Sequence, residues 1–255
     1  MDFEVYTLNS GSKSNSTYIR SGDTRILIDA GMSAKQLECE LNSLKTSLDQ
    51  INAIFITHEH TDHTKGLPII CKRHNIQVHI SELSAPHIKC GDEAYIITHK
   101  PIYSCLMEDM EINSFATPHD SHGSIGYIIK TYGHTVGIAT DLGYVPEYIR
   151  EKLASCDSVI LESNHDIEML EQGPYPYMLK ERILSNRGHL SNQACADCAA
   201  LIAENGVKNI MLAHLSDVNN RPEIAMITTA AELARRGISG VFLKTAAKNQ
   251  ATKLC

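Results

Sequence analysis

The chain lacks any apolar run long enough to cross a membrane. No stretch approaches the roughly 20 apolar residues that a membrane-spanning helix needs. Its first residues, Met1-Asp2-Phe3-Glu4, include acidic side chains where a secretory leader carries basic ones followed by an apolar segment. These two absences argue against an integral or exported protein, and we expect no membrane partner.

Basic residues and patterned cysteines are also scarce. The 255 residues contain 23 Lys plus Arg against 30 Asp plus Glu, for a formal net charge of −7. That balance provides no general attraction to nucleic acid, so a nucleic-acid partner must be held by a local site or by metal ions. The eight cysteines follow no framework of spacings, which indicates reduced thiols in a cytoplasmic protein. We interpret the lone CxxC, Cys195 and Cys198, as two helix-borne thiols.

The hydrophobic pattern alternates between strands and helices along the whole chain. Strands are predicted at residues 2–8, 16–20, 25–30, 53–57, 77–80, 94–97, 101–105, 111–117, 124–132, 134–140, 158–161, 209–213 and 240–244. Helices are predicted at residues 33–47, 64–74, 82–89, 146–154, 176–185, 191–204 and 222–236. Each half is therefore expected to be a sheet covered by helices on its outer face. No linker divides the chain, so we predict a single domain, 1–255, with a frayed polar tail from Lys244.

The densest cluster of metal-binding side chains follows the apolar run Ala53–Ile56. There, the segment Thr57-His-Glu-His-Thr-Asp-His63 places three imidazoles and a carboxylate within six residues. A cluster of metal-binding residues directly after an apolar run is typical of a loop that follows a buried strand. The first two histidines point the same way from extended backbone, and the Asp and last His turn toward a neighbouring point, which suits two adjacent metal ions. Imidazole and carboxylate without a nearby cysteine favour zinc, manganese or iron.

Three later strands end in single candidate ligands, His119, Asp141 and His214. Each is weak evidence alone, because an isolated His or Asp at a strand end is usually a cap or a satisfied polar group. All three lie where a strand gives way to a loop, so one rim of the sheets can gather them. Near the N-terminus, the small residues of Asn9–Asn15 leave backbone N–H groups that can cradle a phosphate. A plain hairpin connection fits that segment equally well.

The order HxHxDH, then His, Asp and His, resembles the ligand series of the metallo-β-lactamase superfamily and spans nearly the whole chain. The resemblance implies an α/β fold, the αββα sandwich of that superfamily. It also implies two divalent metal ions, the first held by His58, His60 and His119, the second by Asp62, His63 and His214, with Asp141 bridging them. His122 is the alternative to His119 as ligand. We favour His119, because it directly follows a predicted strand.

The residues present also make the site similar to one branch of the superfamily. Asp62 and Asp141 both occur and no cysteine stands at the bridging position, as in the phosphodiesterases and nucleases. Two ions about 3.5–4 Å apart suit in-line attack on a phosphodiester by a metal-bound hydroxide, which Asp62 is placed to orient. Glu162 and His189 resemble the pair that relays a proton to the leaving oxygen in the tRNase Z group. The alternative is that Ser191 caps the next helix and His189 only packs nearby.

Four segments together resemble the YycJ (WalJ, VicX) subfamily: Ser10–Thr17, Thr57–His63, Leu161–Asp166 and Gly188–Asn192. That resemblance implies a cytoplasmic exonuclease that removes nucleotides from DNA ends, 5′ to 3′, with mismatch-repair proteins as candidate partners. The candidate substrate-binding residues are Ser14, Asn15 and Ser191. A hydrolase of small phosphodiesters or nucleotides is the alternative, and a lactone or thioester hydrolase is less favoured. The sequence leaves these alternatives, and the oligomeric state, open.

Overall fold

The predicted strands assemble into two mixed sheets in the computed structural model, which describes residues 3–90 and 95–255. The chain divides into two compact units. Unit 1 comprises the residues up to Ala116 together with Ser121–Ile125 and Ala247–Cys255, and unit 2 comprises Thr117–Asp120 and Gly126–Ala246. The single domain expected for residues 1–255 stays a prediction.

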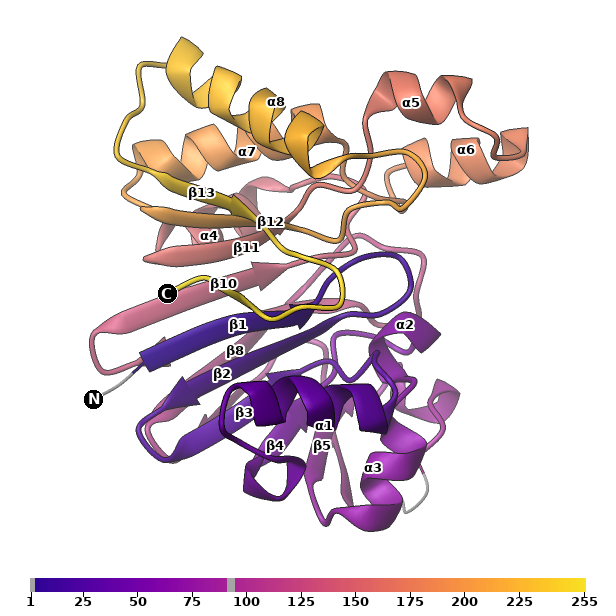
Figure 1. Cartoon of the computed structure of the whole chain (residues 1–255), viewed down its shortest axis with the longest axis vertical. Coiled ribbons are helices and arrows are strands. Elements are labelled where there is room, and N and C mark those ends of the chain that lie inside the picture. Colours follow the sequence, from indigo (N-terminus) through magenta and orange to yellow (C-terminus); the bar gives the residue numbers. More distant parts are fainter. Residues whose placement is uncertain (1–2, 91–94) are drawn as a thin grey trace. The chain divides into compact units, whose positions relative to one another are not determined.

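Unit 1 contains a seven-stranded sheet in the order β14-β1-β2-β3-β4-β5-β6 (Figure 1). Its strands are β1 (Phe3–Asn9), β2 (Ser16–Ser21), β3 (Thr24–Ile28), β4 (Ala53–Phe55), β5 (Gln77–Ser81), β6 (Ile96–His99) and β14 (Thr252–Lys253). β1, β2 and β3 pair antiparallel, whereas β3, β4, β5 and β6 run parallel. β1 therefore runs in the direction of β3, and the carboxyl ends of β1, β3, β4 and β5 meet at one edge of the sheet.

The helices of unit 1 pack their apolar faces on this sheet. α1 (Ala34–Ser43) begins where the Ser33 side chain accepts a hydrogen bond from the Gln36 N–H, as an N-cap residue does. Buried leucines and isoleucines of α1 and α3 (Leu67–Arg73) join one core cluster with residues of β3, β4 and β5. Burial of this cluster removes apolar surface from water and holds the ligand-bearing loops over a rigid base.

Several predicted elements of unit 1 differ in the structure. The helix expected at 64–74 is split into α2 (Thr61–Thr64) and α3, with Gly66 between them and Pro68 at the start of α3. The helix expected at 82–89 is only a 3₁₀ turn, Ala85–His87. The predicted strands 2–8 and 94–97 begin at residues outside those described, and correspond to β1 and β6. The remaining elements are a 3₁₀ turn at Leu48–Gln50 and a hairpin of β7 (Ser104–Met107) and β8 (Met110–Ala116).

Two further expectations are wrong. The tail from Lys244 is not frayed, because Lys253 and Thr252 pair with Tyr6 and Thr7 of β1. The cysteines are not all reduced, because Cys71 of α3 and Cys90 form a disulfide within unit 1. A pair separated by 19 residues in the chain carries no spacing signature, so the sequence could not indicate it.

Unit 2 contains the second run of strands, β9 (Ile125–Thr131), β10 (His134–Ala139), β11 (Ser158–Glu162), β12 (Asn209–Ala213) and β13 (Phe242–Thr245). β9 pairs antiparallel with β10, and β10 to β13 run parallel. The carboxyl ends of β10, β11 and β12 therefore lie at one edge of the sheet. Asp141, Glu162 and His214 stand at these three strand ends.

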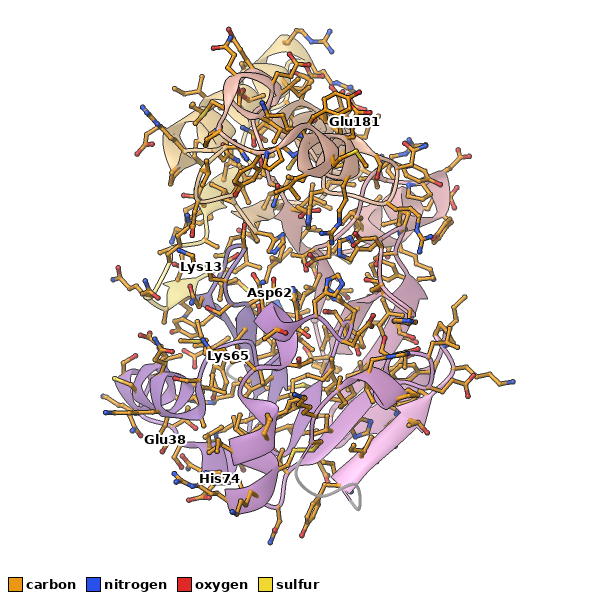
Figure 2. The ribbon with its side chains drawn as sticks, turned by 90° about the vertical axis from the view of Figure 1, so that its right-hand side faces the viewer. Lys13, Glu38, Asp62, Lys65, His74 and Glu181 are labelled. Carbon is orange, nitrogen blue, oxygen red and sulfur yellow. A yellow bond between two sulfur atoms is a disulfide. The ribbon has the colours of Figure 1, made fainter. Side chains whose placement is uncertain are left out.

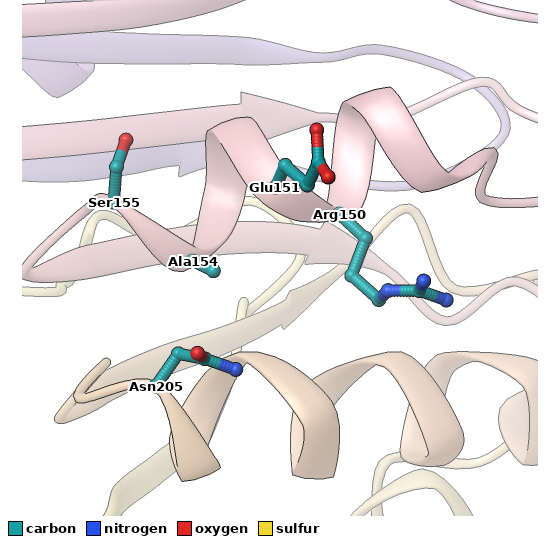
Figure 3. Close-up of a pocket in the computed structure, with 5 residues that line it drawn as sticks. All are labelled: Arg150, Glu151, Ala154, Ser155 and Asn205. Atoms are coloured by element: carbon teal, nitrogen blue, oxygen red, sulfur yellow. The ribbon is translucent and has the colours of Figure 1, made fainter.

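The helices of unit 2 are α4 (Glu147–Ala154), α5 (Ile167–Gln172), α6 (Tyr177–Leu184), α7 (Asn192–Glu204) and α8 (Pro222–Arg235). α5 was not predicted, and α7 begins at Ser191, whose side chain accepts a hydrogen bond from the Ala194 N–H. A pocket of about 340 Å³ lies between the C-terminal ends of α4 and α7, lined by Arg150, Glu151, Ala154, Ser155 and Asn205 (Figure 3). Among the residues described, none of the helices combines the length and apolar character needed to cross a membrane.

Candidate metal centre

Unit 1 gathers four candidate ligands where β4 leads into α2. His58 is fully buried, and the centroid of its ring lies 4.5 Å from that of His60 and 4.2 Å from that of His63. Oδ2 of Asp62 lies 3.3 Å from Nε2 of His63. The short α2 turns Asp62 and His63 back toward the two earlier histidines. The predicted motif therefore places all four of its donors in one loop.

A buried carboxylate, Asp29, orients one of these ligands. Asp29 follows β3, and its Oδ2 lies 2.7 Å from Nδ1 of His63 while its Oδ1 accepts the N–H of Thr57 at 2.8 Å. Nε2 of His63 is thereby turned toward Asp62. Burial raises the pKa of Asp29, and the contacts with His63 and Thr57 oppose that rise without cancelling it. Asp29 was not among the predicted site residues, because the strand expected at 25–30 placed it inside a strand, whereas β3 ends at Ile28.

The loop after β1 braces the same motif. The Asn15 side chain donates from Nδ2 to Oδ2 of Asp62 at 3.2 Å, and this Nδ2 also lies 3.1 Å from Nε2 of His63. A Cβ at Gly31 would lie 1.6 Å from the Asp62 carbonyl oxygen, so only glycine permits this backbone approach. Ser14 accepts a hydrogen bond from Asn9 within the loop. The Asn15 side chain thus contacts two candidate ligands, Asp62 and His63. Substrate binding by Ser14 and Asn15 stays a prediction.

Unit 2 gathers its candidate ligands around the carboxylate of Asp141. Oδ1 of Asp141 lies 3.8 Å from Nε2 of His119 and 3.6 Å from Nε2 of His214, and all three residues are buried. Asp141 and His214 have φ angles of 58° and 57°, a left-handed conformation that is unfavourable for non-glycine residues and frequent at functional sites. Donor atoms of Asp141, His189, His214 and Glu162 lie within 4.8 Å of one another.

Glu162 holds two imidazoles of unit 2 at once. Its fully buried carboxylate has Oε1 2.8 Å from Nδ1 of His189 and 2.7 Å from Nδ1 of His214. Oε2 accepts the backbone N–H groups of Leu142 at 3.0 Å and Leu190 at 3.2 Å. Burial alone would raise the pKa of Glu162, but the charges and hydrogen bonds of the two histidines outweigh it and lower the pKa to about 2. Glu162 and His189, predicted to act as a pair, are in hydrogen-bond contact.

The loop that carries His189 also fixes His119. Nδ1 of His119 donates to the carbonyl oxygen of Gly188 at 3.0 Å, and Nε of Arg187 donates to the His119 carbonyl oxygen at 3.2 Å. Burial lowers the pKa of His119. Burial also acts to lower the pKa of His189, but the neighbouring Glu162 outweighs it, so the net shift is upward. Ser191 caps α7, which is compatible with either role of His189, and substrate binding by Ser191 stays a prediction.

His122, the alternative to His119, lies in unit 1 and has a different partner. Its backbone N–H donates to Oε1 of Glu59 at 2.9 Å, and its Nδ1 lies 2.8 Å from the same oxygen. Glu59 was not among the residues predicted to act at the site. His119, by contrast, faces Asp141 within unit 2.

The residues of both units fit divalent metal ions. The donors are imidazole nitrogens and carboxylate oxygens, the set that zinc, manganese and iron accept. His63 and His214 each have Nδ1 held by a buried carboxylate, and His119 has Nδ1 held by a backbone carbonyl. This is the outer-shell pattern that fixes the tautomer and orientation of ligating histidines. It leaves Nε2 as the ring nitrogen directed to the neighbouring donors.

Comparisons with known proteins agree with this chemistry. The family described as "Beta-lactamase superfamily domain" matches residues 24–215. Exodeoxyribonuclease YycJ of Bacillus anthracis is 31% identical over 243 residues, 93% of this chain and 91% of that protein. Exodeoxyribonuclease WalJ of Streptococcus pneumoniae is 32% identical over 251 residues, 95% of this chain and 93% of that protein. The donor sets described above thus occur in a chain that is similar to named nucleases over nearly its whole length.

A solved structure supports the fold. The metallo-β-lactamase fold protein YhfI of Bacillus subtilis has a TM-score of 0.71 and 15% identity, and the match covers 99% of this chain and 100% of that one. At that identity the likeness bears on the fold alone. Together with the mixed sheets and their flanking helices, it confirms the predicted α/β fold class.

Proposed function

Because this chain belongs to the β-lactamase superfamily, we propose that it is a metal-dependent phosphodiesterase that acts as a DNA exonuclease. Membership of the family and relatives named exodeoxyribonucleases confirm the coarser prediction of a metal-dependent hydrolase. The observation that carries the proposal of a phosphodiesterase is that the Glu162 carboxylate contacts both His189 and His214. It joins a proton-transfer pair to a candidate ligand, an arrangement suited to protonating the leaving oxygen of a phosphodiester beside bound metal.

Two divalent ions, of zinc, manganese or iron, are part of this proposal. The residues that would hold them are His58, His60, Asp62, His63, His119, Asp141 and His214. When bound, such ions supply Lewis acidity, which offsets charge on a phosphoryl group and lowers the pKa of water. The support is the donor set of each unit and its outer-shell hydrogen bonds, and the assignment of ligands to each ion follows the family resemblance.

The side chains of the protein then have distinct tasks. Asp62, held by Asn15, orients the attacking water. His189 has Nδ1 bound to Glu162, so its Nε2 is the nitrogen that hands a proton to the leaving oxygen. The negative charge of Glu162 favours the imidazolium form of His189, which makes that transfer possible near neutral pH.

Local positive charge supports a phosphodiester substrate despite the net charge of −7. In the view of Figure 2, Lys13 is labelled above Asp62 and Lys65 below it, and both lysines are exposed. They offer point charges to a phosphate that approaches the ligand loop. The acidic balance of the whole chain is the observation that favours the second candidate, a hydrolase of small phosphodiesters. Polarity from 5′ to 3′, a cytoplasmic location and mismatch-repair partners are proposed on the family resemblance alone.

The test is degradation of DNA by the purified protein with added Mn²⁺. Linear duplex and single-stranded DNA, labelled at either end, are compared with covalently closed circular DNA, and Asp62→Ala is the blank. We expect the linear forms to be degraded, the 5′ label to be released first and the closed circle to survive. Cleavage of the closed circle would point to an endonuclease, and activity confined to a small phosphodiester would refute the exonuclease proposal.

A further inference from the structure

An exposed pair of stacked imidazole rings stands in unit 1 beside the ligand motif. The rings of His87 and His122 have centroids 3.6 Å apart and planes within 14° of parallel. His87 is the last residue of a 3₁₀ turn and is exposed, and the side chain of His122 is 58% exposed. Neither ring has a task in the proposed metal centre or in proton transfer. We call these two rings the histidine stack.

Glu59 ties the histidine stack to the ligand loop. Glu59 stands in the chain between His58 and His60, and its side chain is only 8% exposed. Its Oε1 accepts the N–H of His122 at 2.9 Å and lies 2.8 Å from Nδ1 of the same residue, while Oε2 accepts the Ser84 hydroxyl at 2.7 Å. Oε1 of Glu59 thus holds His122 near the candidate ligands, and the bond from Ser84 to Oε2 fixes the Glu59 side chain.

The backbone that carries His122 is also closely packed. A Cβ at Gly123 would lie 2.7 Å from Oγ of Ser81 and 2.8 Å from Cβ of Leu83, so the segment leaves no room for a larger residue. The Ile125 N–H donates to the Thr57 carbonyl oxygen at 3.0 Å, next to the motif. An exposed side chain on a firmly held backbone is pre-organised for contact with a ligand, because little conformational entropy remains to be lost on binding.

We propose that the histidine stack is a platform for a nucleobase of the DNA substrate, with Glu59 as its positioning residue. The proposal rests on the proposed function, which brings a DNA strand to the ligand loop. Each ring of the stack keeps one face that is not covered by the other, and a flat, exposed ring next to a nuclease site suits stacking with a base. Stacking on histidine and other flat side chains is a general means of holding single-stranded nucleic acid without regard to sequence.

The experiment compares single-stranded DNA with a small substrate that has no base, methyl p-nitrophenyl phosphate. For His122→Ala and His87→Ala, we expect the KM for DNA to rise about 5- to 150-fold, the range for loss of one stacked base. The kinetics of the small substrate and the metal content should stay as in the wild type. His122→Phe should restore most of the KM for DNA, because a phenyl ring stacks on a base and the backbone N–H at position 122 still donates to Glu59. DNA with abasic nucleotides near its 5′ end should bind the wild type as weakly as it binds His122→Ala.

The matched control is His74→Ala. Nδ1 of His74 lies 2.6 Å from Oδ1 of Asp49, so this residue is also a carboxylate-bound histidine of unit 1, but it stands at the C-terminal end of α3. An unchanged KM for DNA in His122→Ala would overturn the proposal, as would a phenylalanine variant as poor as the alanine one. Equal loss of DNA and small-substrate activity, together with metal, would show a structural role instead. A wild type that cleaves only the small substrate would refute the proposed function itself, and the platform with it.

Discussion

At the scale of single residues, buried carboxylates organise the candidate centre. Asp29 faces His63 in unit 1, and Glu162 faces His189 and His214 in unit 2. Each carboxylate lies where a parallel strand ends, and each is deeply buried. A charge in such a place is costly unless it is paired and hydrogen-bonded, so these contacts hold the imidazoles in one orientation.

The first prediction concerns Asp29→Asn. Asparagine has nearly the same size and tolerates the φ of 63° found at Asp29, but it carries no charge to face His63. We expect metal affinity to fall about 10- to 100-fold, measured by competition with a chromogenic chelator. Asp49→Asn, which removes the partner of the remote His74, is the control. If both variants bound metal as tightly as the wild type, Asp29 would have no part in orienting a ligand.

The second prediction separates proton transfer from metal binding. His189→Ala should lower turnover about 10²- to 10⁴-fold, the usual contribution of a general acid, while the metal content stays unchanged. Glu162→Gln should lower both turnover and metal affinity, because Glu162 also holds His214. The double variant should turn over little more slowly than the worse single one. Metal loss in His189→Ala, measured by elemental analysis, would instead make His189 a ligand.

The contrast between found and missed residues has a physical reason. The donors of Thr57–His63 are contiguous, so their spacing alone predicts a ligand loop. Asp29 and Glu59 act on residues 34 and 63 positions away, and their roles exist only in the folded chain. Asp29 lay within the strand predicted at 25–30, and only the structure, in which β3 ends at Ile28, places it at a strand end. Glu59 carried no signal, because an acidic residue within a loop is usually exposed.

At the scale of elements, the residues that cap helices could be predicted from the sequence. The break within a helix and the pairing of strands distant in the sequence could not. The caps at Ser33 and Ser191 follow from residue type before a periodic apolar pattern. The expected helix 64–74 breaks at Gly66, whose backbone N–H donates to the Ala30 carbonyl oxygen. That contact comes from tertiary packing, which overrides local helix propensity. β14 was missed because its pairing with β1 joins the two ends of the sequence.

The third prediction belongs to a stack of rings across β4, β5 and β6. His79 is stacked between Phe55 and His99, and burial, with a contribution from the charge of His99, lowers the pKa of His79 from 6.5 to about 4. The unfolded chain therefore takes up this proton first, so the stability that His79 contributes is present above pH 6.5 and lost as pH falls toward 4. Between pH 7 and 5 we expect a loss of up to about 2 kcal/mol from this group.

Denaturant titrations of metal-depleted protein at both pH values measure this loss. His79→Phe keeps a ring in the stack but cannot titrate, so its free energy of unfolding should fall less over the same interval. Glu59 and Glu162 have pKa values lowered from 4.5 to about 2, so the stability they contribute is present throughout the interval and is lost only as pH falls below about 4.5. An equal fall in the variant and the wild type would assign the effect to other groups, such as the buried His165.

At the scale of the whole molecule, net charge and local charge act against each other. A formal charge of −7 repels a polyanion at long range, whereas the exposed Lys13 and Lys65 of unit 1 lie above and below Asp62 in the view of Figure 2. Long-range repulsion is screened within about 10 Å at 0.1 M salt. The fold class could be predicted from the alternation of strands and helices and from the family resemblance. Whether net repulsion or local attraction dominates for DNA could not, because it depends on where charged side chains lie on the folded surface.

The last prediction is a salt titration that distinguishes a polymer from a small substrate. Each DNA phosphate neutralised by the protein releases counterions, and three such contacts on duplex DNA would lower the observed affinity about 40-fold between 50 and 200 mM salt. A small phosphodiester has no condensed counterions, so its KM should change far less over the same range. Lys13→Ala and Lys65→Ala should each reduce the slope of log KM for DNA against log salt by about one contact, and Lys208→Ala, an exposed lysine of unit 2 that stands just before β12, is the control. A KM for DNA that does not respond to salt would show that the lysines contribute no phosphate contact and that the ligand loop alone holds the strand.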